Sequence, residues 1–430
     1  MAHALHRVAS VAFAVVVTLG ATYAINLALE PQENEFAVAA AQESWSRTDE
    51  PYVQIDPILE WSQLRLLDMS LDEKVRSLLV LHVPGLDPDA IRSSIASVDS
   101  GGRGAGGLIL MGNNVPGSAE ELAALTAAAT VDPELPPIVS IDEEGGDVVR
   151  LPYDTFAGAD VLRSAPPSDT ADAFAGRAQL LASVGVNLNF GIVADVTDDS
   201  GSFIYWRTLG DDPASASERV AAGVAAESVV VGSTVKHFPG HGRSNDDSHV
   251  GIPTSDVGLD EWHATDALPF KAGIDAGAQA VMFGHLAFSS IDPVPATLSA
   301  AWHDILREEL GFDGIAVTDD MLMLQASGVA EFSDPYVNAV AAVAAGNDAL
   351  LYVMPTDPAT VGIDVSVLAS TIGTQVEQSR IDEAALRMLI FRRSFAPDAM
   401  NWLPPCDVRC LAGAVGSGIS GMPSDALNPQ

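Results

Sequence analysis

Eight short runs of apolar residues, separated by segments with helical spacing, constrain the fold of this chain more than any other feature. Continuous apolar runs of this length are typical of parallel strands that are buried on both faces. The runs are residues 78–83, 107–111, 138–142, 186–196, 234–238, 278–285, 314–319 and 349–354, and helical patterns occupy 119–129, 169–184, 214–231, 259–276 and 301–310. Eight strands that alternate with helices favour a closed barrel over an open sheet. The sequence therefore predicts an α/β fold, a (β/α)8 TIM-like barrel formed by a single domain.

The N-terminal segment differs from the rest of the chain. Residues 8–29 are apolar and carry no formal charge, and polar residues and a small-residue site at 37–39 follow them. This pattern indicates an export signal, although about 22 apolar residues can also just span a bilayer. We therefore expect residues 1–40 to be an export signal or an N-terminal membrane anchor, and the protein to be extracytoplasmic, either secreted or associated with the cell envelope.

Composition suggests how the remaining chain is divided. Residues 30–55 are polar and acidic without periodicity, which predicts a polar linker at 41–60 after the export segment, whereas Ser70 and Glu73 have the spacing of a capping box that opens a helix. The barrel is expected over 61–396, followed by a tail rich in Pro, Gly and Ser at 397–430. Cys406 and Cys410 lie in that tail, where an oxidising compartment would let them pair; two unrelated thiols are the alternative.

Charge excludes one class of partner. The chain has 58 acidic and 21 basic residues, a formal net charge of −37. Such a chain repels nucleic acid, so we expect no nucleic-acid partner and a monomer whose one possible membrane contact is its N-terminal segment. Lysine occurs at only three positions, of which Lys236 lies within a motif.

Polar side chains stand at the C-terminal ends of most predicted strands. In a barrel these ends meet at one mouth, where active sites of this fold are found. The residues are Asn113, Asp142, Asp195, Lys236, His237, His285, Asp319 and Asp320. Polar loops could explain any one of them, but their recurrence on six of the eight runs predicts an active site.

The most specific segment is 236–242, with the sequence KHFPGHG, followed by DSH at 247–249. His237 and His241 are four residues apart, as zinc ligands on a helix would be, but Pro239 and Gly240 would break that helix. We therefore expect neither a metal site nor a cofactor. The loop after 242 is rich in small and polar residues, so it could carry His249 into and out of a site.

This segment resembles the signature of the β-N-acetylglucosaminidases of glycoside hydrolase family 3. Further similarities follow in chain order at 69–74 (MSLDEK), 141–146 (IDEEGG) and 318–321 (TDDM), so the resemblance covers about residues 60–395. It implies the single-domain β-N-acetylhexosaminidase branch, without the C-terminal sandwich domain of the related β-glucosidases.

The resemblance also implies roles for individual residues. Asp319 would be the nucleophile that forms a glycosyl ester, His249 the acid and base, and Asp247 the residue that orients His249. Asp320 would be structural. The residues expected to bind the sugar or to line its pocket are Asp142, Arg150, Arg207, Lys236, His237, His285 and Met321.

Two positions depart from the family pattern. The chain has Glu143 where the family commonly has Gln, and Asp147 where it commonly has Arg. The loss of a positive charge at Asp147 affects the outer subsite and therefore the aglycone.

The predicted function is that of a retaining exo-β-N-acetylhexosaminidase, a glycoside hydrolase that acts on small oligosaccharides with a terminal N-acetylhexosamine. Cell-wall (peptidoglycan) fragments and chitin oligosaccharides are the competing sources. The alternatives are a phosphorylase, because a neutral imidazole repels phosphate less than a carboxylate does, a β-glucosidase, and a carbohydrate-binding protein without catalysis. A metallohydrolase is the remotest alternative.

Overall fold

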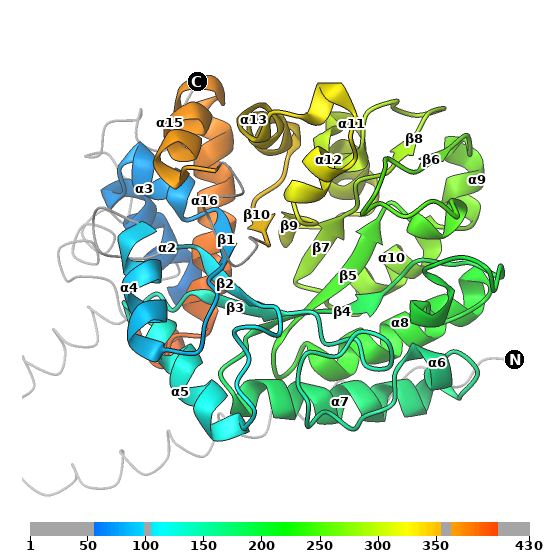
Figure 1. Cartoon of the computed structure of the whole chain (residues 1–430), viewed down its shortest axis with the longest axis horizontal. Helices are drawn as coiled ribbons and strands as arrows, with labels where there is room; N and C mark the ends of the chain where they lie inside the picture. The colour runs from blue at the N-terminus through cyan, green and yellow to red at the C-terminus, as the bar shows by residue number, and fades with distance from the viewer. Residues whose placement is uncertain (1–55, 99–104, 354–362, 403–430) are drawn as a thin grey trace, which may run out of the picture. The chain divides into compact units, whose positions relative to one another are not determined.

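In the computed structural model, eight parallel strands form a nearly closed barrel with helices around it (Figure 1). The structure describes residues 56–98, 105–353 and 363–402. The predicted export segment, most of the linker, both cysteines and most of the tail lie outside these residues. The predicted (β/α)8 fold is confirmed.

Each of the eight apolar runs overlaps one strand of the barrel. The strands are β1 (Leu79–His82), β2 (Gly107–Leu110), β3 (Ile138–Ile141), β4 (Leu188–Val193), β5 (Gly232–Phe238), β7 (Ala280–Phe283), β9 (Ile315–Thr318) and β10 (Leu350–Tyr352). Their order in the sheet is β10-β1-β2-β3-β4-β5-β7-β9. All of their residues are buried, because one face meets the barrel interior and the other meets helices.

The helices connect successive strands and cover the outside of the barrel (Figure 1). The longer ones are α2 (Pro57–Asp68), α3 (Leu71–Arg76), α4 (Pro88–Val98), α5 (Ala119–Ala129), α7 (Pro167–Ser183), α8 (Pro213–Glu227), α9 (Leu259–Ala264), α10 (Ala267–Asp275), α13 (Pro335–Ala345), α15 (Val365–Gln375) and α16 (Gln378–Ser394). The shorter ones are α6 (Ala159–Leu162), η1 (Tyr205–Arg207), η2 (His241–Arg243), η3 (Ala296–Leu298), α11 (Ala300–Asp304), η4 (Ile305–Glu309), α12 (Leu322–Ala326), η5 (Ala330–Phe332) and η6 (Ala399–Asn401).

The first helix begins earlier than the expected barrel boundary at residue 61. Asp56 caps α2 by accepting hydrogen bonds from the backbone N–H groups of Ile58 and Leu59, and Pro57 occupies the first turn. Trp61 of α2 is buried, and α2 packs against α16. The capping box of Ser70 and Glu73 is present at the start of α3.

Two local features were not expected from the sequence. Strands β6 (Thr254–Ser255) and β8 (Ala287–Phe288) form a small parallel sheet within the loops that follow β5 and β7. The helical pattern at 259–276 is divided into α9 and α10. In the described part of the chain, none of the helices combines the length and the apolar character needed to cross a membrane.

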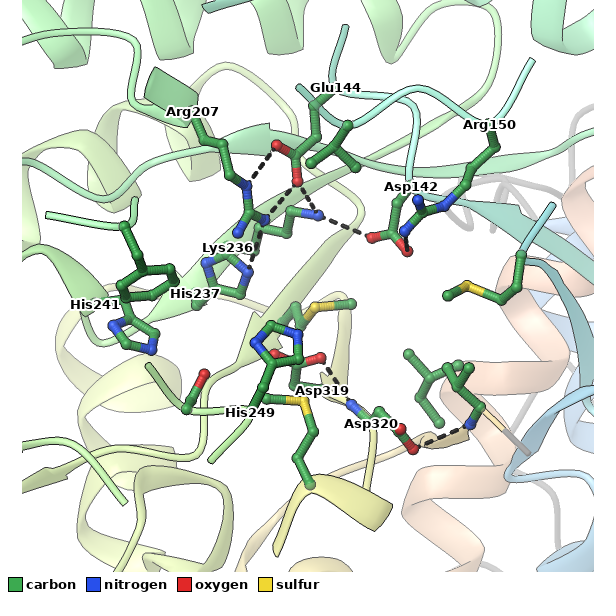
Figure 2. Close-up of a pocket in the computed structure, with 18 residues that line it drawn as sticks. Asp142, Glu144, Arg150, Arg207, Lys236, His237, His241, His249, Asp319 and Asp320 are labelled. Carbon is green, nitrogen blue, oxygen red and sulfur yellow. Dashed lines mark hydrogen bonds and ion pairs between the residues drawn. The ribbon is translucent and has the colours of Figure 1, made fainter. Parts of the chain in front are cut away.

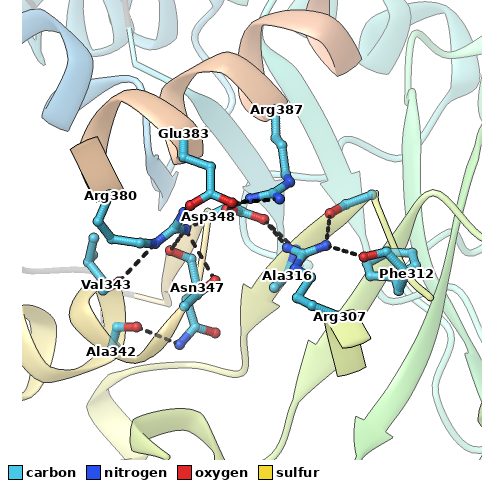
Figure 3. Close-up of polar contacts among 12 residues, drawn as sticks. Arg307, Phe312, Ala316, Ala342, Val343, Asn347, Asp348, Arg380, Glu383 and Arg387 are labelled. Atoms are coloured by element: carbon cyan, nitrogen blue, oxygen red, sulfur yellow. Dashed lines mark hydrogen bonds and ion pairs between the residues drawn. The ribbon is translucent and has the colours of Figure 1, made fainter. Parts of the chain in front are cut away.

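The barrel is joined between β9 and β10 by a backbone bridge and a buried carboxylate. Val317 and Ala349 form the bridge. Asp348, which precedes β10, accepts a hydrogen bond from the backbone N–H of Ala316 at 3.0 Å. Figure 3 shows that arginines from outside the strands converge on the same carboxylate.

Three arginines surround Asp348. Arg307 of η4 lies 2.6 Å from one carboxylate oxygen, and Arg380 and Arg387 of α16 lie 2.5 and 3.2 Å from the other. The Asp348 side chain has no exposed surface. This cluster therefore ties α16 and η4 to the seam of the barrel, at the end opposite the C-terminal ends of the strands.

Candidate active site

A cavity of about 290 Å³ opens at the C-terminal ends of the strands (Figure 2). Its walls combine charged groups, imidazoles and a few apolar side chains. The lining residues are Met111, Asp142, Glu144, Val148, Arg150, Phe203, Arg207, Lys236, His237, His241, Ser248, His249, Met282, Asp319, Asp320, Met323, Leu351 and Val353. The C-terminal end of the strands is where barrel enzymes hold their active sites.

One wall of the cavity is a network of alternating charges. Lys236, near the end of β5, lies 2.9 Å from an oxygen of Asp142 and 2.6 Å from one of Glu144. Arg207 of η1 forms two hydrogen bonds to Glu144, at 2.7 and 2.9 Å. Arg150 approaches the other oxygen of Asp142 at 3.9 Å. The sequence predicted these cations and Asp142, but not Glu144.

The network fixes the charge of its members. Burial by itself would raise the pKa of Glu144, but Lys236 and Arg207 lower it to about 2. Burial opposes the charged form of Lys236 as well, yet Asp142 and Glu144 raise its pKa. Charged groups held in place in this way can donate and accept hydrogen bonds to sugar hydroxyls without first being reorganised.

The ring of His237 lies between the carboxylate of Asp195 and the guanidinium of Arg207. Its Nδ1 lies 2.7 Å from Asp195, and its Nε2 lies 3.4 Å from Arg207. Because a carboxylate accepts and a guanidinium donates, Nδ1 carries the hydrogen and Nε2 is the acceptor. Burial favours the neutral form of Asp195, but His237 lowers its pKa. Asp195 itself does not line the cavity. Its hydrogen bond to Nδ1 orients the His237 ring, and its carboxylate also accepts a hydrogen bond from the backbone N–H of His241 at 2.6 Å.

Close packing explains the glycines of the 236–242 motif. Gly240 has a φ of 134°, a backbone conformation that favours glycine. A side-chain carbon on Gly242 would collide with the carbonyl oxygen of Val196. The peptide bonds Lys236–His237 and Phe238–Pro239 are both cis. His237, near the end of β5, and His241, in the segment after it, both line the cavity.

Asp319 follows β9 and lies at the floor of the cavity (Figure 2). Burial by itself would raise the pKa of the Asp319 carboxyl group. His237, His285 and the backbone N–H of Asp320 lower it by more, so the pKa is below its usual value. That N–H donates to Asp319 at 2.7 Å. Asp319 is therefore ionised at neutral pH, as a nucleophile must be.

Asp320 also borders the cavity, but one of its carboxyl oxygens is hydrogen-bonded to backbone N–H groups. It accepts hydrogen bonds from the N–H groups of Leu322 and Val353 at 3.1 and 3.0 Å. Burial raises its pKa to about 7, and the neighbouring Asp319 contributes to the increase. These contacts join the turn after β9 to the end of β10.

Two residues that were predicted to line the pocket do not do so. His285 is fully buried, with Nε2 2.9 Å from the carbonyl oxygen of Asp320 and Nδ1 2.9 Å from the hydroxyl of Thr297. Met321 is 2% exposed and belongs to the apolar core. His285 thus supports the turn below the cavity, and Met282 and Met323 are the methionines that reach it.

His249 lies at the rim of the cavity and is paired with Asp247. The Nδ1 atom of His249 lies 2.6 Å from the carboxylate of Asp247, which also accepts the backbone N–H of His249 at 2.9 Å. Burial would raise the pKa of Asp247, but these contacts lower it. The His249 side chain is 64% exposed, and Asp247 does not contact the cavity directly. His249 Nε2 is the ring atom left for proton transfer.

Glu143 shapes the loop that carries Arg150. One carboxyl oxygen accepts the backbone N–H groups of Arg150 and Leu151 at 2.9 and 3.1 Å. Burial raises the pKa of Glu143 to about 8, and the negative charge of Asp154 contributes. Glu143 is therefore protonated at neutral pH, and its hydrogen bonds hold the loop in place.

Several lining residues were missed by sequence reasoning. Glu144 follows Asp142 at the end of a predicted strand and His241 belongs to the motif, so both carried a signal. Ser248 lies in the DSH segment at 247–249, so it carried a signal too, whereas Phe203 carried none. Within the described residues, no group of three or more His, Cys, Asp or Glu side chains is arranged to hold a metal ion.

Comparison with known proteins identifies related sequences. The model of the glycosyl hydrolase family 3 N-terminal domain matches residues 70–391. A β-hexosaminidase of Xanthomonas campestris is 36% identical over 238 residues, which are 52% of this chain and 71% of that protein. A β-hexosaminidase of Pseudomonas aeruginosa is 32% identical over 250 residues, covering 56% and 73%.

Solved structures with the same fold include two related hydrolases. A glycoside hydrolase family 3 β-N-acetylglucosaminidase from Paenibacillus has a TM-score of 0.68 and 28% identity, covering 78% of this chain and 64% of that chain. A β-N-acetylhexosaminidase from Beutenbergia cavernae has a TM-score of 0.65 and 28% identity, covering 76% and 99%.

Proposed function

Because the chain belongs to glycosyl hydrolase family 3, we propose that it is a β-N-acetylhexosaminidase that removes terminal β-linked N-acetylglucosamine by a retaining mechanism. The similarity to β-hexosaminidases over 71% of their length supports the reaction class. The observation that carries the mechanism is the convergence of three features on one cavity: the ionised Asp319, the wall of paired charges, and the His249–Asp247 pair at the rim.

The first step forms a glycosyl ester. A carboxylate oxygen of Asp319 attacks the anomeric carbon while the bond from that carbon to the leaving oxygen breaks. His249, protonated on both nitrogens, gives its Nε2 proton to the leaving oxygen, and the sugar stays bound to Asp319. The carboxylate of Asp247 accepts the Nδ1–H bond and stabilises the imidazolium before transfer.

The second step releases the sugar. His249, now neutral, takes a proton from a water molecule at Nε2, and the resulting hydroxide-like oxygen attacks the anomeric carbon. The ester bond to Asp319 breaks and its carboxylate is regenerated. Two inversions at the anomeric carbon give net retention of configuration. Because His249 is largely exposed in this structure, the loop that carries it moves toward the cavity when substrate binds.

The charged wall binds the non-reducing sugar. Asp142 and Lys236 each keep hydrogen-bonding capacity beyond their ion pair, and Arg150, Arg207 and the ring of His237 border the same space. Groups of this kind suit hydroxyls, which both donate and accept. The limited volume of about 290 Å³ matches one terminal sugar and supports exo-action.

We further propose that the protein acts outside the cytoplasm, since residues 1–40 have the pattern of an export signal or anchor. Cell-wall fragments of peptidoglycan that end in N-acetylglucosamine are then the accessible substrate, and chitin oligosaccharides are the competing source. Hydrolysis of the two purified oligosaccharides, compared by kcat/KM, distinguishes these sources.

The proposal is tested with 4-methylumbelliferyl conjugates of β-N-acetylglucosamine, β-N-acetylgalactosamine and β-glucose. We expect the full chain to cleave the N-acetylglucosamine conjugate fastest, with a rate that is insensitive to EDTA and to phosphate. A sugar 1-phosphate formed in phosphate buffer would instead identify a phosphorylase, and cleavage of the glucose conjugate alone would identify a β-glucosidase. Binding without turnover would indicate a carbohydrate-binding protein.

A further inference from the structure

His241 differs from the other histidines around the cavity. The rings of His237, His249 and His285 each have a hydrogen-bond partner. The ring of His241 is 1% exposed and lines the cavity, yet neither its Nδ1 nor its Nε2 has a partner among the described residues. Buried polar atoms are nearly always hydrogen-bonded, and leaving one without a partner is unfavourable. A ligand group that enters the cavity can supply the missing partner.

The ring of His241 is neutral under ordinary conditions. Burial lowers its pKa to about 4, although the negative charge of Asp195 acts in the opposite direction. A neutral imidazole offers one N–H donor and one nitrogen acceptor. It therefore suits an uncharged polar group better than it suits a carboxylate or a phosphate.

An apolar surface adjoins this ring. Phe203 meets His241 edge to face, with ring centroids 4.7 Å apart, and both rings line the cavity. The opposite wall, formed by Asp142, Arg150 and Lys236, is charged. In Figure 2, His241 lies on one side of Asp319 and the pair Asp142–Arg150 lies on the other. The cavity therefore has one side where paired charges predominate and another where the uncharged rings of His241 and Phe203 meet, although Arg207, which contacts His237, also lines it.

The position of Asp319 indicates which part of a sugar meets each side. A nucleophile must lie beneath the anomeric carbon, and the substituent at C2 is attached to the adjacent carbon. His241 is close enough to Asp319 for the two groups to interact electrostatically. A C2 substituent that points toward His241 would leave the more distant hydroxyls of the ring facing the charged side.

We infer that His241 and Phe203 form the subsite for the acetamido group of the terminal sugar, with the His241 N–H donating to the acetamido carbonyl and Phe203 packing against the methyl group. An acetamido group combines an uncharged polar amide with a methyl, which matches a neutral donor beside an aromatic ring. The inference rests on the proposed function, because it concerns the substrate of the same site. His241 would then be a specificity-determining residue that contacts substrate.

The test measures the preference for N-acetylglucosamine over glucose. For the wild type and for His241→Phe, His241→Gln and Phe203→Leu, kcat/KM is determined with the 4-methylumbelliferyl conjugates of both sugars, and the Kd of free N-acetylglucosamine and of glucose is determined by calorimetry. We expect His241→Phe to lower the ratio of kcat/KM values about tenfold to a hundredfold, and the ratio of affinities in the same direction. His241→Gln, which keeps a donor, should recover most of the ratio, and Phe203→Leu should lower it about twofold to fivefold.

The controls separate this role from a structural one. His303 is another buried histidine whose pKa burial lowers to about 4, but it does not line the cavity, so His303→Gln should leave both ratios unchanged. If His241→Phe slows both conjugates equally and leaves the affinity ratio unchanged, the ring is a structural element or holds an ordered water only, and the inference fails. A wild type that neither cleaves nor prefers N-acetylglucosamine would instead overturn the proposed function, and the inference with it.

Discussion

Two aspartates at opposite ends of neighbouring strands show how the same side chain can serve the fold or the chemistry. Asp348 precedes β10 and accepts hydrogen bonds from three arginines and from the backbone of Ala316 (Figure 3). Asp319 follows β9, and within the described residues its carboxylate accepts one hydrogen bond, from the backbone N–H of Asp320. The acceptor capacity of Asp348 is saturated, whereas that of Asp319 is largely free.

The difference follows from the two ends of the barrel. At the N-terminal end a carboxylate is surrounded by fixed protein donors and is closed to solvent, so it can only stabilise the packing of η4 and α16 on the strands. At the C-terminal end Lys236 and the rings of His237 and His285 help to keep Asp319 ionised, and none of them is hydrogen-bonded to its carboxylate oxygens. A buried carboxylate with free lone pairs is available to a substrate.

The largest effect should come from removing the unsaturated carboxylate. We expect Asp319→Ala to lower kcat by about four to six orders of magnitude, because the variant lacks the carboxylate that forms the glycosyl ester. Azide should partly restore turnover by entering the space that the carboxylate leaves. The measurement is kcat on the N-acetylglucosamine conjugate with and without azide, alongside the urea midpoint of unfolding, which should change little. A fully active variant would end the mechanistic proposal.

Removing the charge of the saturated carboxylate, Asp348, should lower stability and leave turnover nearly unchanged. Asp348→Asn leaves Arg307, Arg380 and Arg387 close together without their shared counter-charge, so we expect the free energy of unfolding to fall by about 3–5 kcal/mol. The kcat of the folded fraction should stay within about threefold of the wild type, since the cluster lies at the other end of the barrel. Urea denaturation and active-site titration measure the two quantities. Unchanged stability combined with lost turnover would contradict the division of roles.

Asp247 lies between these two cases, because it acts on another catalytic group. Asp247→Asn keeps the size of the side chain but weakens the hydrogen bond that orients His249 and stabilises its imidazolium. We expect kcat to fall about tenfold to a hundredfold with little change in the Kd of N-acetylglucosamine. Pre-steady-state kinetics should show that both glycosylation and hydrolysis of the ester are slower. A change in Kd alone would assign Asp247 to substrate binding instead.

Glu143 extends the comparison to a buried carboxyl group that forms no ion pair with a cation among the described residues. Unfolded Glu has a pKa of about 4.3, and burial raises that of folded Glu143 to about 8. Between these values the folded protein holds a proton that the unfolded chain has released, so the contribution of Glu143 to the free energy of unfolding decreases as pH rises. Above the folded pKa this decrease stops.

Glu143→Gln removes this titration while keeping an oxygen that can accept the N–H groups of Arg150 and Leu151. We therefore expect the variant to lose less stability than the wild type between about pH 5 and about pH 8, which urea midpoints at the two pH values measure. If both proteins lose the same amount of stability between the two pH values, Glu143 does not titrate in this range.

Much of the fold could be predicted because parallel strands of a barrel are buried on both faces. All eight apolar runs overlap a strand. Most runs are longer than their strands, as where 186–196 contains Leu188–Val193 and 278–285 contains Ala280–Phe283, but β5 begins at Gly232, before its run at 234–238. The start of the helix at Pro57 was missed because the linker was extended to residue 60, although the apolar residues Ile58, Leu59 and Trp61 continue across that boundary. Strands β6 and β8 are two residues long, too short for a periodic pattern to be visible.

The candidate site was predictable where an ionisable residue stands directly at the end of a predicted strand. Asp142, Lys236 and Asp319 stand directly at strand ends, and these ends meet at one mouth. His285 also stands at a strand end, yet it turns under the cavity and holds the Asp320 backbone. Phe203 reaches the cavity from a loop and has no sequence signal.

The sequence by itself determined the barrel, the end at which the site lies and the residue types that can carry the reaction, because burial and strand order are repeated local patterns. Only the tertiary structure decided that Asp348 is saturated and Asp319 is not, that Glu144 joins Lys236 to Arg207, and that the His241 ring has no partner. These properties depend on which side chains from distant segments meet across the barrel. Hydrogen bonding and burial act over a few ångströms in space, and sequence separation does not set that distance.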